Sequence, residues 1–418
     1  MTDPGPLGSG RAGRRRADPV IRFSAGEMAR RWDLARGLMD RHDLRALLLF
    51  GNSGVNRHNQ ANVFWLSNHL DLHHSYLVAP RDQAIEPALY TGLRNHVPDA
   101  RRIAEVPVVE WGGHDPAATA AGRLRATGIT RGRLGLVGVN ATFGMGMPHQ
   151  HHATLRRLLP GLELVEVTAE LASLRAVKSD EEVRWLRRAA ELTDRAVEAL
   201  RAEVRPGIPE YALLGIVEGA YRSDGGLPHI AFLRSMPMAA PNGCLPAQNP
   251  SDRVLRQGDV VITEISASWW GYSGQVHRPV FVRAEPTAAW QRLFDTALDA
   301  YRGIVQALRP GACEADVIRA ASVIGERGYG IYDDLVHGYG VDIHPPVVDR
   351  SCARFWPWDP ARPAPAGRRF ERNMAVVVQP NPVTPDERMG LQLGALTLVT
   401  DGGARSLHRV PFEPVITG

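Results

Sequence analysis

The chain has 418 residues, of which 44% are hydrophobic and 22% are charged, a composition ordinary for a soluble globular protein. Its length exceeds what one hydrophobic core usually organises, so two domains are expected. The formal net charge is +4, from 49 Lys and Arg against 45 Asp and Glu, and this near balance argues against a nucleic-acid-binding protein. No apolar stretch reaches about eighteen residues, so no membrane span is expected.

The first segment, residues 1–19, is rich in Gly, Pro and Arg and is predicted to be a disordered basic tail. No apolar segment follows its arginines, so a secretory signal is not expected. Cys244, Cys313 and Cys352 are too widely spaced for a zinc or redox motif. These features together predict a cytoplasmic protein.

Residues 20–168 are predicted to form a smaller α/β domain. Apolar residues recur at helical spacing in 20–42, and the apolar run 46–50 reads as a buried strand. Strand patterns then alternate with helical ones, which is typical of an α/β domain. The further strands are expected at 75–79, 87–90, 106–110 and 134–139, and a helix at 115–127.

Residues 169–418 are predicted to form a second domain whose pattern occurs twice. The connecting segment 169–179 ends at Ser179, which with Glu182 forms a capping box for a long helix that stops at Pro206. The order of long helix, Pro-Gly, short helix and strands then repeats, and this indicates an internal duplication. Its helices are expected at 210–223, 287–308 and 314–327.

Between the two copies lies a predicted β-hairpin. An apolar run over 260–265 enters a turn containing Gly271, and a second run leaves over 276–282. Glu264 interrupts the first run, and burial of a carboxylate among apolar residues is costly unless another group pairs with it. We therefore interpret Glu264 as a site residue, with an exposed glutamate on an edge strand as the alternative.

Several phrases of the second domain resemble the creatinase/aminopeptidase P/methionine aminopeptidase superfamily, which has the pita-bread fold. The resemblance implies an α+β fold class, with a pita-bread C-terminal domain made of pseudo-twofold duplicated α-β halves after a smaller creatinase-type α/β domain. It also implies membership among the Xaa-Pro peptidase-like proteins. The matching phrases are LRAVKS at 174–179, GDVV at 258–261, HGYGVDIH at 337–344, VQP at 378–380 and LVTDG at 398–402.

The metallopeptidases of this superfamily hold two divalent metals with two Asp, one His and two Glu. Carried onto this chain, those positions fall on Glu264, Gln275, His337, Gln379 and Gly394. One carboxylate and one imidazole remain, whereas divalent ions require several anionic oxygens or imidazoles. We therefore predict no metal and no cofactor, with a weak single metal on Glu264 and His337 as the alternative.

Creatinase cleaves a C–N bond without a metal, but its residues are not retained either. Its basic His falls on Gln248, and a carboxylate of the second hairpin arm falls on His277. A polar pocket nevertheless remains, and amides suit a neutral or zwitterionic ligand. The predicted catalytic residues are His337 for proton transfer, Glu264 to activate it, and His277; the predicted substrate-binding residues are Gln275, His344, Gln379, Gln248, Gln392 and Tyr339.

The functional hypothesis is a metal-independent, creatinase- or aminopeptidase P-like hydrolase that acts on a C–N bond of a small polar metabolite. The alternatives are an inactive pseudopeptidase that binds a ligand or protein, and an Xaa-Pro peptidase-like hydrolase with a weak single metal. The resemblance further implies a homodimer in which segment 67–76, with its three histidines, approaches the partner's pocket. A second histidine group at 149–152 is expected to begin a helix, and the Pro- and Trp-rich insert 354–360 is either a lid or a packed loop.

Overall fold

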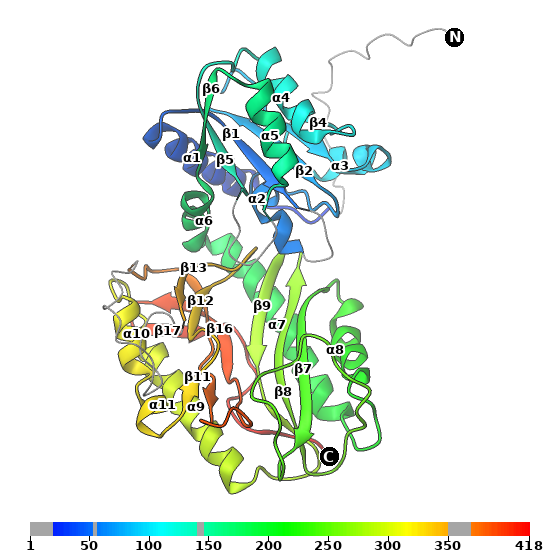
Figure 1. The fold of residues 1–418 in the computed structure, drawn as a ribbon, viewed down its shortest axis with the longest axis vertical. Helices are drawn as coiled ribbons and strands as arrows, with labels where there is room; N and C mark the ends of the chain where they lie inside the picture. The colour runs from blue at the N-terminus through cyan, green and yellow to red at the C-terminus, as the bar shows by residue number, and fades with distance from the viewer. Residues whose placement is uncertain (1–19, 53–56, 140–145, 350–368) are drawn as a thin grey trace.

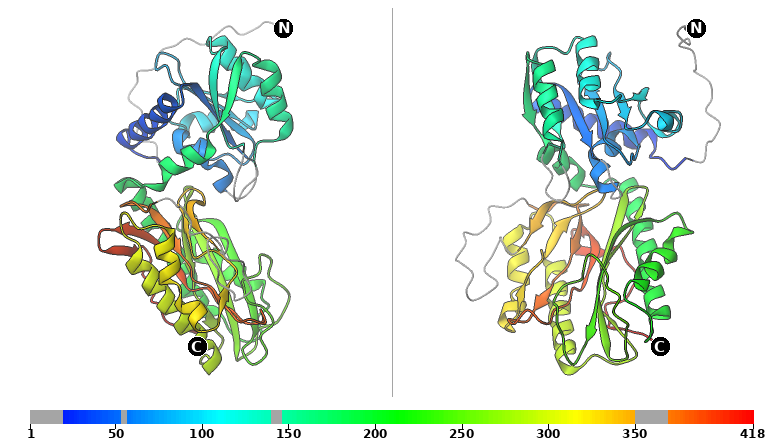
Figure 2. Two further views of the ribbon diagram at one scale, coloured as in Figure 1. Left: turned by 60° about the vertical axis from the view of Figure 1, so that its left-hand side comes forward. Right: turned by 45° about the vertical axis from the view of Figure 1, so that its right-hand side comes forward.

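The computed structural model describes residues 20–52, 57–139, 146–349 and 369–418 (Figure 1). The predicted tail at 1–19, Cys352 and the insert at 354–360 lie outside these residues. Two domains follow one another along the long axis of the molecule, and the chain passes between them at α6 (Thr168–Ala176) and α7 (Asp180–Glu203) (Figures 1 and 2). Within the described ranges, no helix combines the length and apolar character that crossing a lipid bilayer requires.

The N-terminal domain is built on a six-stranded sheet with the order β4-β3-β2-β1-β5-β6. The central strand β1 pairs antiparallel with β2 and parallel with β5. Its apolar run is continuous because both faces are buried, Leu47 and Leu49 on one and Leu48 and Phe50 on the other. The elements are α1 (Ala25–Arg41), β1 (Leu44–Gly51), η1 (Arg57–Gln60), α2 (Ala61–Ser67), β2 (Ser75–Pro80), β3 (Ala88–Thr91), η2 (Arg94–His96), α3 (Val97–Ile103), β4 (Val108–Trp111), α4 (Pro116–Ala126), β5 (Gly132–Val137), α5 (His149–Leu158) and β6 (Leu162–Glu166).

The domains are joined by a buried polar network around Arg31 of α1. Arg31 donates to Glu27 at 2.7 Å and to the hydroxyl of Tyr272 at 2.9 Å, and Tyr272 donates to Glu182 at 2.6 Å. Glu182 also closes the predicted capping box with Ser179 at the start of α7. This network ties α1, the long helix and the tip of the hairpin together.

The C-terminal domain is built on a sheet that is ten-stranded over the described residues, with the path β13-β12-β14-β16-β9-β8-β10-β18. The strands of the two halves meet where β9 pairs with β16, and Figure 1 shows them side by side. The elements are α8 (Ala212–Arg222), β7 (Leu227–Pro237), β8 (Asp259–Trp269), β9 (Tyr272–His277), β10 (Val280–Phe281), α9 (Ala288–Ala307), α10 (Glu314–Ala320), α11 (Val323–Glu326), β11 (Gly330–Ile331), β12 (Val336–Gly338), β13 (His344–Val348), β14 (Ala375–Val378), β15 (Pro382–Val383), β16 (Gly394–Thr400), β17 (Gly403–Ser406) and β18 (Val415–Ile416).

The sequence-based elements of this domain are mostly confirmed. The hairpin turns at Trp270 and Gly271, which have φ values of 46° and 87°, as a tight two-residue hairpin turn requires. The predicted helix 314–327 is wrong as one unit, because it is divided into α10 and α11 around Ala321. The long helix also ends at Glu203, three residues before the proline that was expected to stop it.

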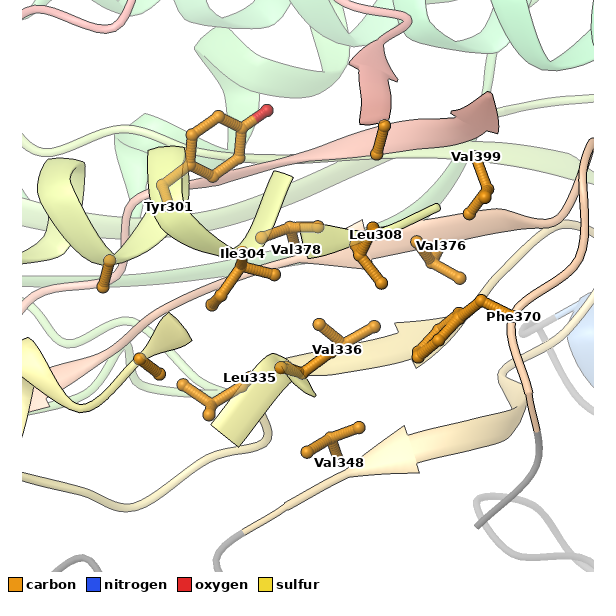
Figure 3. Packing of buried hydrophobic residues seen from close by; sticks show 14 of the residues in the cluster. Tyr301, Ile304, Leu308, Leu335, Val336, Val348, Phe370, Val376, Val378 and Val399 are labelled. Atoms are coloured by element: carbon orange, nitrogen blue, oxygen red, sulfur yellow. The ribbon is translucent and has the colours of Figure 1, made fainter. Parts of the chain in front are cut away.

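Alternation along the strands separates an apolar face from a polar one. On one face, Val336, Val376 and Val378 pack with Ile304 of α9, as Figure 3 shows for the second half. Val276 of β9 packs with α7 and α8 in the first half. The residues next to these valines along the strands point to the opposite face. They include the predicted site residues His337, Gln275, His277 and Gln379.

Candidate functional site

The first half of the site comes from the hairpin of β8 and β9. Glu264 lies inside β8, where it pairs with Phe232 of β7, so it is on an interior strand and the edge-strand alternative is wrong. Gln275 and His277 both lie on β9 and are fully buried. The amide nitrogen of Gln275 donates to Glu264 Oε1 at 2.9 Å.

The second half of the site closes a ring of hydrogen bonds with the first. His337 on β12 donates from Nε2 to Gln275 Oε1 at 3.3 Å and from Nδ1 to the carboxylate of Asp334 at 2.9 Å. Gln275 donates to Gln379 Oε1 at 3.3 Å, and Gln379 donates to Asp334 at 3.1 Å. Four side chains, separated by up to 104 residues, therefore form a closed circuit that joins both half-domains.

The Asp334 and His337 pair has the geometry of an oriented acid-base group. Burial alone lowers the pKa of His337, but the charge and hydrogen bond of Asp334, with the charge of Asp333, outweigh burial and raise the pKa above 6.5. Both imidazole nitrogens face acceptor oxygens, and the protonated form, which has two N–H donors, satisfies both. His337 is therefore a proton-carrying group that Asp334 holds in place.

Two carboxyl groups, Asp333 and Asp334, lie near enough to Glu264 to repel its charge. Burial, followed by repulsion from Asp333 and Asp334, raises the pKa of Glu264 well above its ordinary value. Burial and repulsion from Asp334 raise the pKa of Asp333 to about 6. Groups whose pKa lies closer to neutrality exchange protons more readily at physiological pH than ordinary carboxylates do.

His277 and Gly394 face each other across the seam of the two halves. They are partners in the register of β9 and β16, and a Cβ atom at Gly394 would lie 2.9 Å from His277 Nδ1. Burial, followed by the charges of His337 and Arg278, lowers the pKa of His277 well below 6.5, so the imidazole is neutral. Its Nε2 lies 3.3 Å from the amide of Gln275, and its buried Nδ1 has no hydrogen-bond partner among the described residues.

Tyr339 lies beyond the ring at the end of β12. Its hydroxyl lies 2.9 Å from Ser266 Oγ of β8 and 2.9 Å from His229 Nδ1 of β7. The centroids of the His337 imidazole and the Tyr339 phenol are 5.5 Å apart, so Tyr339 adjoins the ring of hydrogen bonds. Tyr339 is among the residues predicted from the sequence, whereas His229 and Ser266 are not.

Besides Glu264, His277 and Tyr339, three more predicted site residues lie outside the ring. Gln248 is exposed in the loop between β7 and β8, and among the described residues no hydrogen bond joins it to the site, so its predicted role in the pocket is not supported by its position. His344 is buried but directs Nε2 to Lys178 at 3.1 Å, because β13 places it opposite Gly338. Gln392 is buried and donates to Asp333 at 2.8 Å, which connects it to the acidic side of the site.

Asp333 and Asp334 are likewise absent from the residues predicted from the sequence. They precede His337 by four and three residues, just before β12 begins. Carboxylates so close in sequence to a predicted catalytic histidine were a signal that could have identified them. Asp334 and His337, which contact each other, are only three residues apart in the sequence. For His229 no comparable signal exists, since it comes from a different strand.

The five positions that the resemblance assigns to two metals do not fit such a centre here. Both nitrogens of His337 are engaged, one by Asp334 and one by an amide oxygen. The amides of Gln275 and Gln379 bond to each other, and Gly394 contributes no ligand. In the described part of the chain, no three His, Cys, Asp or Glu side chains are grouped to hold a metal ion.

The histidines of the N-terminal domain are used in other ways. In segment 67–76, Asp71 accepts from the backbone amides of His73 and Gly92, each at 3.0 Å, and His69 is buried beside it. The second group does begin a helix, α5, as predicted. Its His151 bonds to the hydroxyl of Tyr76 at 3.0 Å within the same domain.

Comparison with known proteins supports the two-domain fold. Residues 184–401 match the family described as "Metallopeptidase family M24", and residues 31–177 match "Creatinase/Prolidase N-terminal domain". The chain is 28% identical over 318 residues to "Uncharacterized peptidase YqhT" of Bacillus subtilis, covering 74% of this chain and 81% of that protein. It is 23% identical over 384 residues to "Xaa-Pro dipeptidase" of Pyrococcus horikoshii, covering 90% and 95%.

A solved structure of similar fold is "X-Pro aminopeptidase from Thermotoga maritima MSB8", with a TM-score of 0.75 and 17% identity over 92% of this chain and 99% of that one. The two-domain α+β fold that the resemblance implied is thereby confirmed. The family match spans more than half of the chain and includes all four residues of the hydrogen-bonded ring. The chain therefore belongs to metallopeptidase family M24, as a hydrolase of the Xaa-Pro peptidase superfamily with a creatinase/prolidase-type N-terminal domain.

Proposed function

We propose that this chain hydrolyses a C–N bond of a small polar or zwitterionic metabolite by proton transfer between side chains, without the two-metal centre of its family. The observation that carries the proposal is the closed ring of Asp334, His337, Gln275 and Gln379. In this ring, the side-chain nitrogen and oxygen atoms that would ligate a metal ion form hydrogen bonds with one another instead. The ring itself holds a proton ready for transfer.

The proposed roles follow from the charges of the groups. Ionised Glu264 is a stronger base than an ordinary glutamate because its pKa is raised, so it can take a proton from water as the water oxygen bonds to the substrate carbon. Protonated His337 can give its proton to the departing nitrogen as the C–N bond breaks. Neutral His277 offers a hydrogen bond to the substrate, and the amides of Gln275, Gln379 and Gln392 bind its polar groups.

The test combines metal analysis with a substrate screen. Elemental analysis after mild dialysis should give well under one divalent ion per chain. The dialysed protein should then hydrolyse a member of a panel of Xaa-Pro dipeptides and guanidino compounds such as creatine. His337→Ala and Glu264→Gln should each lower the rate on the order of a hundred- to ten-thousand-fold.

The control is His151→Ala, which removes a hydrogen-bonded histidine of the N-terminal domain and should leave the rate unchanged. Two tightly held ions per chain, with activity lost on their removal, would contradict the metal-free mechanism. One weakly held ion that restores activity would favour a single metal on Glu264 and His337 instead.

A second candidate is a non-catalytic binding protein. The long distances of 3.3 Å within the ring and the departure from both known residue sets favour it over a typical peptidase. Thermal-shift screening distinguishes the two, because a ligand that binds only the native state raises the melting temperature whether or not it is turned over. Ligands that stabilise the protein but remain intact would favour the binding protein.

We also propose that the chain is a homodimer and cytoplasmic. In segment 67–76, Leu72 is 46% exposed and the side chain of His73 is 45% exposed, so both are available to a partner chain. Cys244 and Cys313 are free thiols, which suits a reducing compartment. A stable monomer in light scattering at micromolar concentration would count against the dimer.

A further inference from the structure

We infer that His229 is a positioning residue of this site, which sets the hydroxyl of Tyr339 beside His337. The inference rests on the proposed function, and it adds a residue from β7, a strand that supplies none of the predicted site residues. Ser266 completes the group. Three observations carry it: a local irregularity of β7, a three-way hydrogen-bonding contact, and the proximity of that contact to the ring.

The first observation is that β7 carries a bulge at His229. Along the β7 and β8 pair, Pro228 is opposite Ala267 and Ile230 is opposite Ser266, so His229 is an extra residue without a partner in the register. A bulge of this kind turns a side chain away from the regular alternation of the strand, and bulges often occur beside active sites. Here it turns His229 towards the polar face of the sheet.

The second observation is a triangle of polar atoms. His229 Nδ1 lies 2.9 Å from the Tyr339 hydroxyl and 3.3 Å from Ser266 Oγ, and the two hydroxyls are 2.9 Å apart. Ser266 and Tyr339 are fully buried, whereas His229 is partly exposed. Burial lowers the pKa of His229 to about 3 and raises the pKa of Tyr339, so the triangle carries no charge at neutral pH.

A neutral triangle restricts the hydroxyl of Tyr339. A neutral imidazole has one donor and one acceptor nitrogen, and a phenol has one hydrogen. The protonation of His229 Nδ1 therefore decides whether Tyr339 spends its hydrogen on His229 or keeps it for another acceptor. Tyr339 adjoins His337. This choice therefore decides whether Tyr339 presents a hydrogen-bond donor or an acceptor to an uncharged polar group of a substrate beside His337.

The third observation is the place of the triangle in the site. Ser266 is the cross-strand partner of Gln275, and Glu264 lies two residues before it on the same face of β8. The triangle thus adjoins Gln275 and Glu264, and Asp333, which accepts a hydrogen bond from Gln392, supplies a carboxyl group to the same site. The triangle can orient an uncharged group of the substrate, while the carboxyl group can accept hydrogen bonds from an amine or similar donor.

The contact itself is tested by NMR of the full chain labelled with 13C and 15N at histidine. Loss of signals in His229→Asn identifies the resonances of His229. Tyr339→Phe should then shift the Nδ1 resonance of His229. The matched control is Ser268→Ala, which alters a buried serine two residues from Ser266 whose hydroxyl has no hydrogen-bond partner among the described residues, and it should leave the resonance in place. An unchanged Nδ1 resonance in Tyr339→Phe would overturn the inference, whether or not a substrate is known.

The positioning role is tested with the substrate found among the Xaa-Pro dipeptides and creatine. His229→Asn keeps a polar atom near the place of Nδ1 and should keep most of kcat, whereas His229→Leu should lose about ten- to a hundred-fold in kcat with a smaller change in KM. Equal activity of the two variants would overturn the inference.

If the wild type turns over none of the probes, the proposed function fails, and titration of the labelled protein with Ala-Pro and creatine decides the inference. A response of His337 without His229 would then overturn it, and a joint response would support it. If neither histidine responds, the result of Tyr339→Phe alone decides whether His229 fixes Tyr339.

Discussion

Gly394 is one of the five positions that the resemblance assigns to metal ligands, and the space left there for a side chain can be tested. It begins β16, opposite His277. A Cβ atom there would overlap the carbonyl oxygen of Val378 and would lie 2.9 Å from both His277 Nδ1 and Gln379 Cα. Gly394→Ala, the smallest addition, should therefore destabilise the C-terminal domain.

The magnitude follows from which atoms are in the way. Overpacking a well-packed core costs about 1–3 kcal/mol, and the upper half of this range applies because the nearest atom is backbone rather than a side chain that can rotate. For a domain of this size, about 1 kcal/mol changes Tm by roughly 2–4 °C, so Tm should fall on the order of 5–10 °C. Adding His277→Ala should recover only a minor part, because the Val378 carbonyl remains.

Thermal unfolding followed by circular dichroism or calorimetry measures this effect. The matched control is Gly215→Ala in the exposed face of α8, where no atom lies within 4 Å of the added Cβ. That variant should be more stable by about 0.5–1 kcal/mol, since alanine favours a helix over glycine. A Tm for Gly394→Ala equal to that of the wild type would refute the close approach of β14 and β16. Full recovery in the double variant would assign the clash to His277 instead.

Three further predictions concern buried charged groups and their hydrogen bonds. Asp334→Asn removes the charge that raises the pKa of His337, so the loss of activity as His337 deprotonates with rising pH should begin at a lower pH in the rate profile than in the wild type. Hydrogen bonds hold the pKa of Asp71 at about 2 against the effect of burial, so Asp71→Asn should lower stability on the order of 2 kcal/mol at pH 7, and the difference from wild type in chemical denaturation should shrink as the pH falls from 3.8 towards 2. Tyr272→Phe leaves Arg31 and Glu182 each with one hydrogen bond fewer in the domain junction, which should cost on the order of 1–3 kcal/mol, and an unchanged Tm would mean that the junction does not depend on this hydroxyl.

The sequence alone determined much of the scaffold of this protein. The apolar run 260–265 located β8, whereas the second predicted run, 276–282, covers only the end of β9 together with β10. The capping box at Ser179 is a local signal of four residues, and it formed as predicted. The spacing of the motifs was sufficient to recognise the family that the comparisons confirm.

Only the tertiary structure decided which of these residues act together. Gln275 reaches His337 and Gln379 across 62 and 104 residues, and the pairing of β9 with β16 that brings them together depends on register between distant strands. The same register turned His344 to Lys178, and the extra residue in β7 brought His229 to Tyr339. Residue type and local period fix the face on which a side chain lies, whereas its partner depends on strand pairing and loop paths that no local pattern encodes.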